Sequence, residues 1–215
     1  MFLRNIIAAA ILVTIGSCNT THSLGQSQTG TVKQQDSLLA DADGNRYPVK
    51  VFAGHSLWMT ANLNLNIPDS YCYENATKNC EQYGRLYTWE TAKQGCSLLG
   101  EGWRLPTKDE WEQLTDLYGG VFKRDSSGSG KSAYKELLKP GNAQFNVVLG
   151  GGRAPDNGYR RGDAHGFYWT ATESDNSMAY FLNFGKGSQT LYLQNDGEKA
   201  DAFSVRCVKR IDSSK

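Results

Sequence analysis

Five cysteines are the residues in this 215-residue chain whose type and spacing indicate chemistry most directly. Four of them, Cys72, Cys80, Cys96 and Cys207, form an even set, and in an oxidising compartment an even set pairs into disulfides with three possible connectivities. Cys72 and Cys80 flank a short polar stretch that suits a local disulfide, which leaves Cys96 to pair with Cys207. A zinc site is the alternative, but no CxxC or HxxxH spacing supports it.

The three histidines, His22, His55 and His165, are the remaining candidates for acid–base chemistry. No motif links any of them to a nucleophile. Whether two carboxylates stand at the separation that glycoside cleavage needs depends on the folded structure, so the sequence leaves that alternative open. The sequence therefore favours a protein that is not an enzyme.

The N-terminal residues have the layout of an export signal. Arg4 precedes an apolar run, Ile6 to Ile15, that is too short to span a bilayer. The run ends in Ile15-Gly16-Ser17-Cys18, which resembles a bacterial lipobox, so we expect Cys18 to be lipidated and to become the mature N-terminus. An ordinary signal with a chance cysteine is the alternative.

This interpretation divides the chain into three parts. Residues 1–17 are the expected lipoprotein signal peptide. Residues 18–36, which are rich in Ser, Thr and Gln, are the expected flexible tether. Residues 37–215 are the expected folded domain. A lipid anchor would place this domain on the bacterial cell envelope, and we expect it at the outer membrane. Its location on the cell surface and its location on the periplasmic side are both alternatives.

Composition restricts the class of protein and its partners. Hydrophobic residues make up 39% of the chain and aromatic residues 11%, which is typical of a globular domain and excludes collagen, coiled coil and wholesale disorder. The 23 basic residues nearly balance the 22 acidic ones, so no bulk charge recruits nucleic acid. Four tryptophans in apolar segments, Trp58, Trp89, Trp103 and Trp169, are expected in the core.

The pattern of secondary structure predicts an α+β fold with two helices and several short strands. One helix is expected over residues 85–96, and a second follows the capping box Thr107–Glu110 and stops at Gly119-Gly120. Strands are expected over residues 47–52, 57–59, 168–170, 178–184, 190–193 and 203–208.

Several segments, in their order and spacing, resemble the bacterial FISUMP "major paralogous" domain family. They are Trp58-Met59 with Asn62-Leu63-Asn64, Tyr83 to Trp89, Gly102 to Thr107 with Glu110-Trp111, Tyr168 to Glu173, and Phe203 to Val208. The resemblance covers roughly residues 38–210. It implies a C-type lectin-like fold, in which two helices flank small antiparallel sheets with long loops. It also favours the Cys96–Cys207 disulfide, because such domains commonly tie the first helix to the last strand.

Two groups of proteins with that fold have functional motifs that this sequence matches only in part. The stretch from Trp103 to Trp111 is similar to one in formylglycine-generating enzymes, but these use a pair of copper-binding cysteines near the C-terminus, where this chain has only Cys207. Calcium-binding lectins use motifs that Pro155-Asp156-Asn157 and Asn195-Asp196 match faintly, and both are expected to be turns. No metal or cofactor is therefore expected, with calcium as the alternative.

A ligand face is expected on the Gly-rich loop from Gly151 to Gly166 and on the late strands. Tyr, Asn and Arg side chains suit adaptable binding surfaces, and the candidates are Arg153, Asp156, Asn157, Tyr159, Arg160, Tyr180 and Tyr192. A solvated loop without a partner is the alternative. The sequence thus favours an envelope lipoprotein that binds a glycan or a protein. The alternatives are a structural lipoprotein and an unrecognised enzyme, and the oligomeric state is open.

Overall fold

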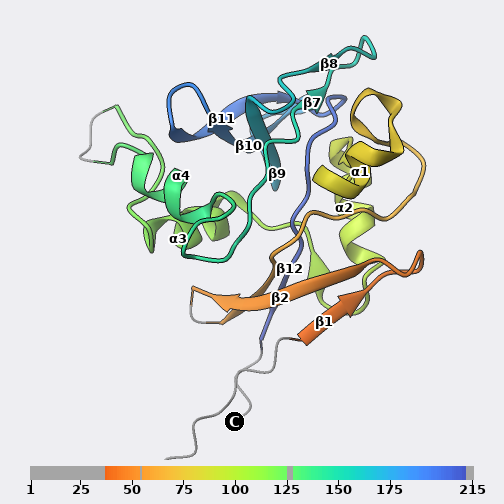
Figure 1. Ribbon diagram of the computed structural model, residues 1–215, viewed down its shortest axis with the longest axis horizontal. Coiled ribbons are helices and arrows are strands. Elements are labelled where there is room, and N and C mark those ends of the chain that lie inside the picture. Colours follow the sequence, from red (N-terminus) through yellow and green to blue (C-terminus); the bar gives the residue numbers. More distant parts are fainter. Residues whose placement is uncertain (1–36, 54, 125–127, 212–215) are drawn as a thin grey trace, which may run out of the picture. The chain divides into compact units, whose positions relative to one another are not determined.

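The structure is a computed structural model that describes residues 37–53, 55–124 and 128–211 (Figure 1). Its largest sheet has five antiparallel strands in the order β1-β2-β3-β12-β6. They are β1 (Ser37–Ala40), β2 (Arg46–Phe52), β3 (Ser56–Met59), β12 (Val208–Arg210) and β6 (Trp103–Arg104). Because β12 pairs with β3, the first and last described strands belong to one sheet. In β2, buried Tyr47 and Val49 alternate with exposed Arg46 and Pro48, as a half-buried strand requires.

A second sheet has three antiparallel strands in the order β11-β10-β9. They are β9 (His165–Glu173), β10 (Met178–Gly185) and β11 (Thr190–Glu198), and they contain the three strands predicted there. Two short strand pairs complete the sheets: β4 (Ser70–Tyr71) with β5 (Leu86–Tyr87), and β7 (Gly152–Arg153) with β8 (Tyr159–Arg160), of which the second is a hairpin.

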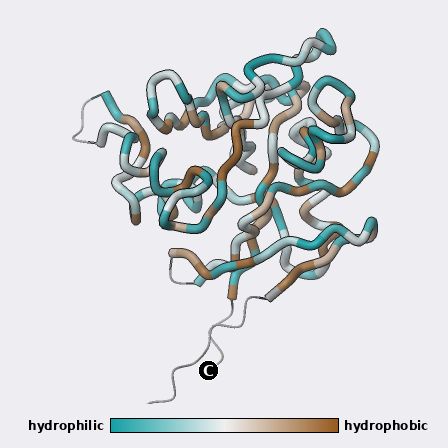
Figure 2. Tube along the Cα trace, in the orientation of Figure 1, coloured by the Kyte–Doolittle hydropathy of each residue, from teal (hydrophilic) through white to brown (hydrophobic). Residues whose placement is uncertain are grey.

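The predicted strand over 203–208 is regular only from Val208 onward. Phe203 and Ser204 instead form isolated bridges, Phe203 with Tyr87 and Ser204 with Tyr168. This segment crosses between sheets, so its backbone bonds are shared among several partners. Hydrophobic residues recur along it and along β9 (Figure 2).

The described residues contain four α-helices, so the prediction of two is wrong. The helices are α1 (Thr77–Tyr83), α2 (Trp89–Ser97), α3 (Lys108–Asp116) and α4 (Lys131–Leu137), with a 3₁₀ turn, η1 (Tyr73–Asn75). The two unexpected helices, α1 and α4, have seven residues each, too few for a clear hydrophobic period. The helix expected over 85–96 begins only at Trp89, because Leu86 and Tyr87 pair with β4.

The capping box at the start of α3 is present as predicted. The Glu110 backbone N–H donates to Thr107 Oγ1 at 3.2 Å, and Glu110 Oε2 accepts from the Thr107 N–H at 2.9 Å. Arg104 on β6 pairs with the same carboxylate at 2.6 Å. This pairing and the bond from Thr107 hold the pKa of Glu110 below its usual value, although burial opposes them. The cap therefore also ties α3 to the five-stranded sheet.

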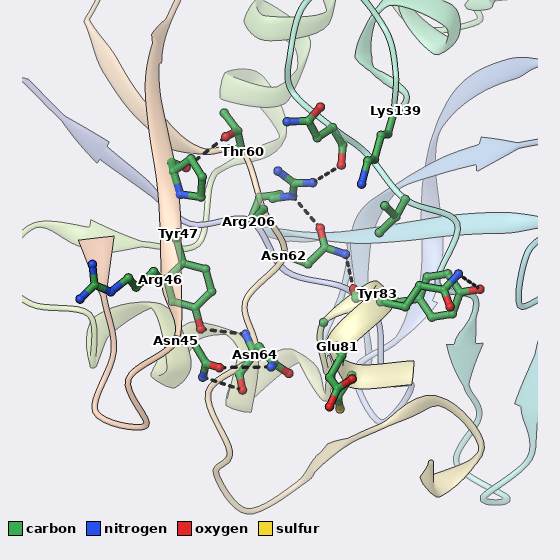
Figure 3. A pocket seen from close by; sticks show the side chains of 17 residues that line it. Asn45, Arg46, Tyr47, Thr60, Asn62, Asn64, Glu81, Tyr83, Lys139 and Arg206 are labelled. Atoms are coloured by element: carbon green, nitrogen blue, oxygen red, sulfur yellow. Dashed lines mark hydrogen bonds between the residues drawn. The ribbon is translucent and has the colours of Figure 1, made fainter. Parts of the chain in front are cut away.

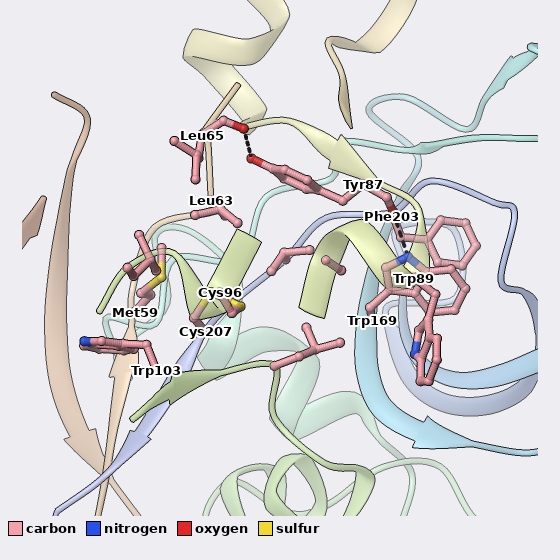
Figure 4. Close-up of a cluster of buried hydrophobic side chains, with 14 of the residues drawn as sticks. Met59, Leu63, Leu65, Tyr87, Trp89, Cys96, Trp103, Trp169, Phe203 and Cys207 are labelled. Carbon is pink, nitrogen blue, oxygen red and sulfur yellow. Dashed lines mark hydrogen bonds between the residues drawn. A yellow bond between two sulfur atoms is a disulfide. The ribbon is translucent and has the colours of Figure 1, made fainter. Parts of the chain in front are cut away.

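The four tryptophans predicted in the core are buried, and so is Trp111. In a first cluster, the ring centres of Trp169 and Phe203 lie 4.4 Å apart. This cluster also contains Trp89, Met59 and the Cys96–Cys207 disulfide (Figure 4). In a second cluster, the ring centres of Trp58 and Trp111 lie 4.9 Å apart. These aromatic pairs supply burial that short strands and helices alone could not.

Two disulfides join Cys72 to Cys80 and Cys96 to Cys207, the pairing that the sequence favours. The first closes a local loop around η1. The second links α2 to the residue just before β12, across a sequence separation of 111.

Candidate functional site

Five of the seven predicted ligand residues lie on the β7–β8 hairpin. Arg153 and Tyr159 are cross-strand partners, and Asp156 and Asn157 occupy the turn between them. Asp156 Oδ1 accepts from the Gly158 N–H at 2.8 Å, and this bond, helped by Arg160, lowers the pKa of the carboxyl. Arg160 pairs with the same side chain at 2.6 Å. The turn is therefore ordered by its own side chains.

The hairpin packs against the loop that the Cys72–Cys80 disulfide closes. The Arg153 guanidinium lies 3.9 Å from the centre of the Tyr71 ring. The Tyr159 ring lies 5.3 Å from that of Tyr73, and its hydroxyl donates to Asn75 Oδ1 at 2.7 Å. These contacts give the predicted ligand residues a fixed support.

The segment that follows β8 is anchored to α1. The Tyr83 hydroxyl donates to Asp163 Oδ1 at 2.5 Å, and burial together with this bond raises the pKa of Tyr83 to about 12. The Gly162 N–H donates to the Tyr73 hydroxyl at 3.1 Å. The loop from 151 to 166 is thus held at several points rather than free in solvent.

The other two predicted residues, Tyr180 and Tyr192, lie on opposite faces of the three-stranded sheet. Tyr192 is the cross-strand partner of Asn183, so it shares a face with Asn183 and Phe181. Tyr180 precedes Phe181 at a β-bulge, and its ring faces the Lys108 ammonium of α3 at 5.8 Å. The structure therefore brings Tyr192, but not Tyr180, to the face that continues toward the hairpin.

That face carries a row of polar side chains across three strands, which we call the polar row: His165 on β9, Asn183 on β10 and Gln194 on β11. His165 Nδ1 and Asn183 Oδ1 are 2.8 Å apart, and Asn183 Nδ2 donates to Gln194 Oε1 at 2.5 Å. Because the Asn183 oxygen accepts, His165 Nδ1 carries the proton. Across the described residues, no hydrogen bond to protein involves His165 Nε2 or Gln194 Nε2. A neutral His165 ring therefore offers an acceptor at one end of the row, and the Gln194 amide offers a donor at the other.

Two depressions flank the polar row. One, of about 470 Å³, is lined by Phe122, Arg124, Tyr192 and Gln194 among others. Its Phe122 ring is 41% exposed and lies 5.3 Å from the Tyr192 ring. An aromatic pair beside hydrogen-bonding side chains is a common lining of ligand sites.

The second depression, of about 290 Å³, lies between the β7–β8 hairpin and Phe167 of β9. It is lined by Arg153, Arg160, Arg161, Phe167, Asp201 and Phe203 among others. Phe167 stacks on His165 at 5.4 Å and is the cross-strand partner of Asn183. We call the polar row and these two depressions the sheet–hairpin face.

Asp201 is the ionisable group of this face whose pKa changes most. Burial, and secondarily the nearby Glu198 carboxylate, raise its pKa from 3.8 to about 6. The carboxylate therefore changes charge in a mildly acidic range, among arginine side chains.

Sequence reasoning missed Phe122, Asn183 and Gln194. A signal was present for Asn183, because it interrupts the apolar pattern of β10 between Leu182 and Phe184. Pro155-Asp156-Asn157 is a turn, as expected, but Asn195-Asp196 lies within β11. That expectation of a second turn is wrong, because the β10–β11 pairing continues to Glu198.

Across residues 37–53, 55–124 and 128–211, no three His, Cys, Asp or Glu side chains gather as a metal site would require. Within the same ranges, no helix has the length and hydropathy to cross a bilayer. Cys18, the expected signal peptide and the expected tether lie outside the described residues and stay predictions.

Residues 50–209 match the family model described as the Fibrobacter succinogenes major domain. No curated protein matches the chain significantly.

Proposed function

The chain belongs to the Fibrobacter succinogenes major domain family, and from this premise we propose that it is a non-catalytic binding module of the bacterial cell envelope. The observation that carries the proposal is the polar row beside the exposed Phe122 ring and the partly exposed Tyr192 ring. Aromatic rings offer a stacking surface, and the ends of the row offer one donor and one acceptor.

The chemistry of this face favours a hydroxyl-rich ligand, which means a glycan. A hydroxyl both donates and accepts, so neighbouring hydroxyls on a sugar satisfy His165 Nε2 and Gln194 Nε2 together. The apolar face of a sugar ring packs on Phe122 and Tyr192. The hairpin arginines extend the same surface for a longer ligand.

We propose that lipidation of Cys18 holds the module at the envelope, by the signal described above. Replacing Cys18 with Ala should then move the protein from the membrane fraction to the soluble fraction. Unchanged partitioning into detergent would refute the anchor but would leave the binding face untouched.

We also propose that the fold is C-type lectin-like. Two features support this: β12 lies beside β3 in one sheet, and the Cys96–Cys207 disulfide ties α2 to the residue before β12. A solved structure that superposes on this fold class would test the proposal.

The binding proposal is tested with the purified full chain on a glycan array. Replacing Tyr192 with Ala should reduce the affinity for any bound glycan by roughly tenfold, the scale of one lost aromatic contact. Replacing Gln194 with Ala removes the free donor and should weaken binding as well.

Tyr180 provides the matched control, because it is the same residue type on the neighbouring strand but faces α3. Replacing Tyr180 with Ala should leave glycan affinity unchanged. Absence of any bound glycan, or equal losses for the two tyrosines, would refute the proposal and favour a structural envelope role.

A further inference from the structure

A second cavity, separate from the sheet–hairpin face, lies beside the buried side chain of Arg206. It has a volume of about 380 Å³ and is bordered by the start of β2, residues 60–64, the end of α1 and residues 139–148 (Figure 3). It shares no lining residue with either depression of the sheet–hairpin face. Its volume is within the range of sites for small organic ligands.

The Arg206 guanidinium is fully buried, and all its partners are neutral. Its Nε donates to Asn62 Oδ1 at 2.6 Å, and its other nitrogens donate to the backbone carbonyls of Met59, Phe145 and Asn146 at 2.8 to 3.2 Å. None of the ion pairs in the described residues includes it. Burial lowers its pKa, but a guanidinium stays charged in proteins. A positive charge therefore stands behind the cavity wall without a compensating carboxylate.

Lys139 brings a second positive charge to the same cavity. Its ammonium points toward the end where Arg206 and Asn62 lie (Figure 3). Within the described residues, no ion pair or side-chain hydrogen bond involves this ammonium. Glu81 is the acidic residue of the cavity lining, and it lies at the opposite end of the view.

Lys139 lines this cavity and Arg206 is buried in its wall, so both place positive charge at the same end of it. A carboxylate there would form a charge-assisted hydrogen bond with Lys139 and would be attracted by the buried Arg206 charge, which protein shields less than water does. We propose that this cavity binds a small organic oxyanion, with Lys139 in direct contact and Arg206 as a buried source of positive potential.

The proposal is tested by calorimetry on the full chain with galacturonate, galactose and inorganic sulfate. Galacturonate should bind, and galactose should not, because it has a similar ring and no charge. Sulfate should bind more weakly than galacturonate, because it leaves much of the cavity unfilled. Replacing Lys139 with Gln should weaken galacturonate binding by about tenfold or more, the scale of one charge-assisted hydrogen bond.

Lys135 provides the control, since it is an exposed lysine on α4 that does not line this cavity. Replacing Lys135 with Gln should leave galacturonate binding intact, and so should Tyr192→Ala, because its site is elsewhere. No binding of galacturonate, equal binding of galactose, or an unchanged affinity in the Lys139 variant would overturn the proposal. Equal binding of sulfate and galacturonate would overturn the statement that the cavity prefers an organic oxyanion. Repeating the titrations in the Tyr192→Ala variant, which weakens sugar binding at the sheet–hairpin face, distinguishes binding in this cavity from binding there.

Discussion

The surroundings of Arg206 and the sheet–hairpin face use similar polar side chains in opposite ways. Around Arg206, four hydrogen bonds from a fully buried guanidinium reach backbone carbonyls and Asn62. On the sheet–hairpin face, Arg160 pairs with Asp156 while both side chains stay more than 60% exposed. The first arrangement joins segments far apart in the sequence, and the second orders a single turn.

We therefore expect the surroundings of Arg206 to contribute mainly to stability and the sheet–hairpin face mainly to binding. Polar groups around Arg206 hold residues 59–62, 145–146 and 206 together, so removing one leaves buried acceptors unpaired. On the sheet–hairpin face the hydrogen bonds are local and some groups remain free, so a substitution there should alter binding more than folding.

The largest effect is expected at the disulfide next to Arg206. Replacing both Cys96 and Cys207 with Ala should lower the free energy of unfolding by about 5 kcal/mol, because the bond closes a loop with a sequence separation of 111. Removing Cys72–Cys80, with a separation of 8, should cost only about 2.5 kcal/mol. Denaturant unfolding of the two double variants measures both, and equal losses would contradict the loop-length argument.

Arg206 itself should give the next largest effect. Arg206→Met keeps most of the volume but removes the donor to Asn62 Oδ1 and to the backbone carbonyls of Met59, Phe145 and Asn146. The expected loss is about 3–5 kcal/mol, because several polar acceptors lose their donor together and an unpaired buried acceptor costs about 1–3 kcal/mol. Arg210→Met on the exposed end of β12 is the control and should change stability by less than about 0.5 kcal/mol. A small effect at Arg206 would remove the contrast between the two regions.

The contrast between local and long-range contacts also explains which parts of the fold could be predicted from the sequence. Local signals sufficed where one segment decides its own structure: the capping box of α3 and the alternation in β2 are both present. They failed for α1, whose buried residues are only Cys80 and Tyr83 and whose position depends on the Cys72–Cys80 disulfide. Of the strand expected over 203–208, only Val208 lies in a regular strand, because the backbone hydrogen bonds of the residues before it go to distant segments.

The candidate sites follow the same rule. The hairpin residues from Arg153 to Arg160 could be predicted because a Gly-rich polar loop is visible in one stretch of sequence. The Arg206 cavity could not, because its walls come from segments separated by as many as about 160 residues. Tyr180 and Tyr192 have the same type and similar settings in sequence, and only the strand register places them on different faces.

The smallest effect concerns pH and the sheet–hairpin face. The pKa of Asp201 is raised to about 6 in the folded protein, above the unfolded value of about 3.9. The folded state therefore binds the proton more tightly. The stability that this provides is complete below about pH 4 and is lost as the pH rises through about 6.

Asp201→Asn should remove that loss. At neutral pH the variant should be more stable than the wild type by about 1 kcal/mol, a value reduced for the solvent that reaches this half-buried side chain. At about pH 4 the two proteins should unfold alike, because the wild-type carboxyl is then protonated. Urea unfolding at several pH values measures the difference, and a gap that is constant with pH would show that burial of Asp201 is not its cause.

Asp156→Asn gives the opposite sign on the same face. The pKa of Asp156 is lowered by the Gly158 N–H and Arg160, so its contribution is present above the unfolded pKa and is lost as the pH falls. This variant should therefore be less stable than the wild type at neutral pH, with the gap closing in acid. The half-buried Asp201 and the exposed Asp156 would then respond to pH in opposite directions, because burial dominates the pKa of the first and hydrogen bonding that of the second.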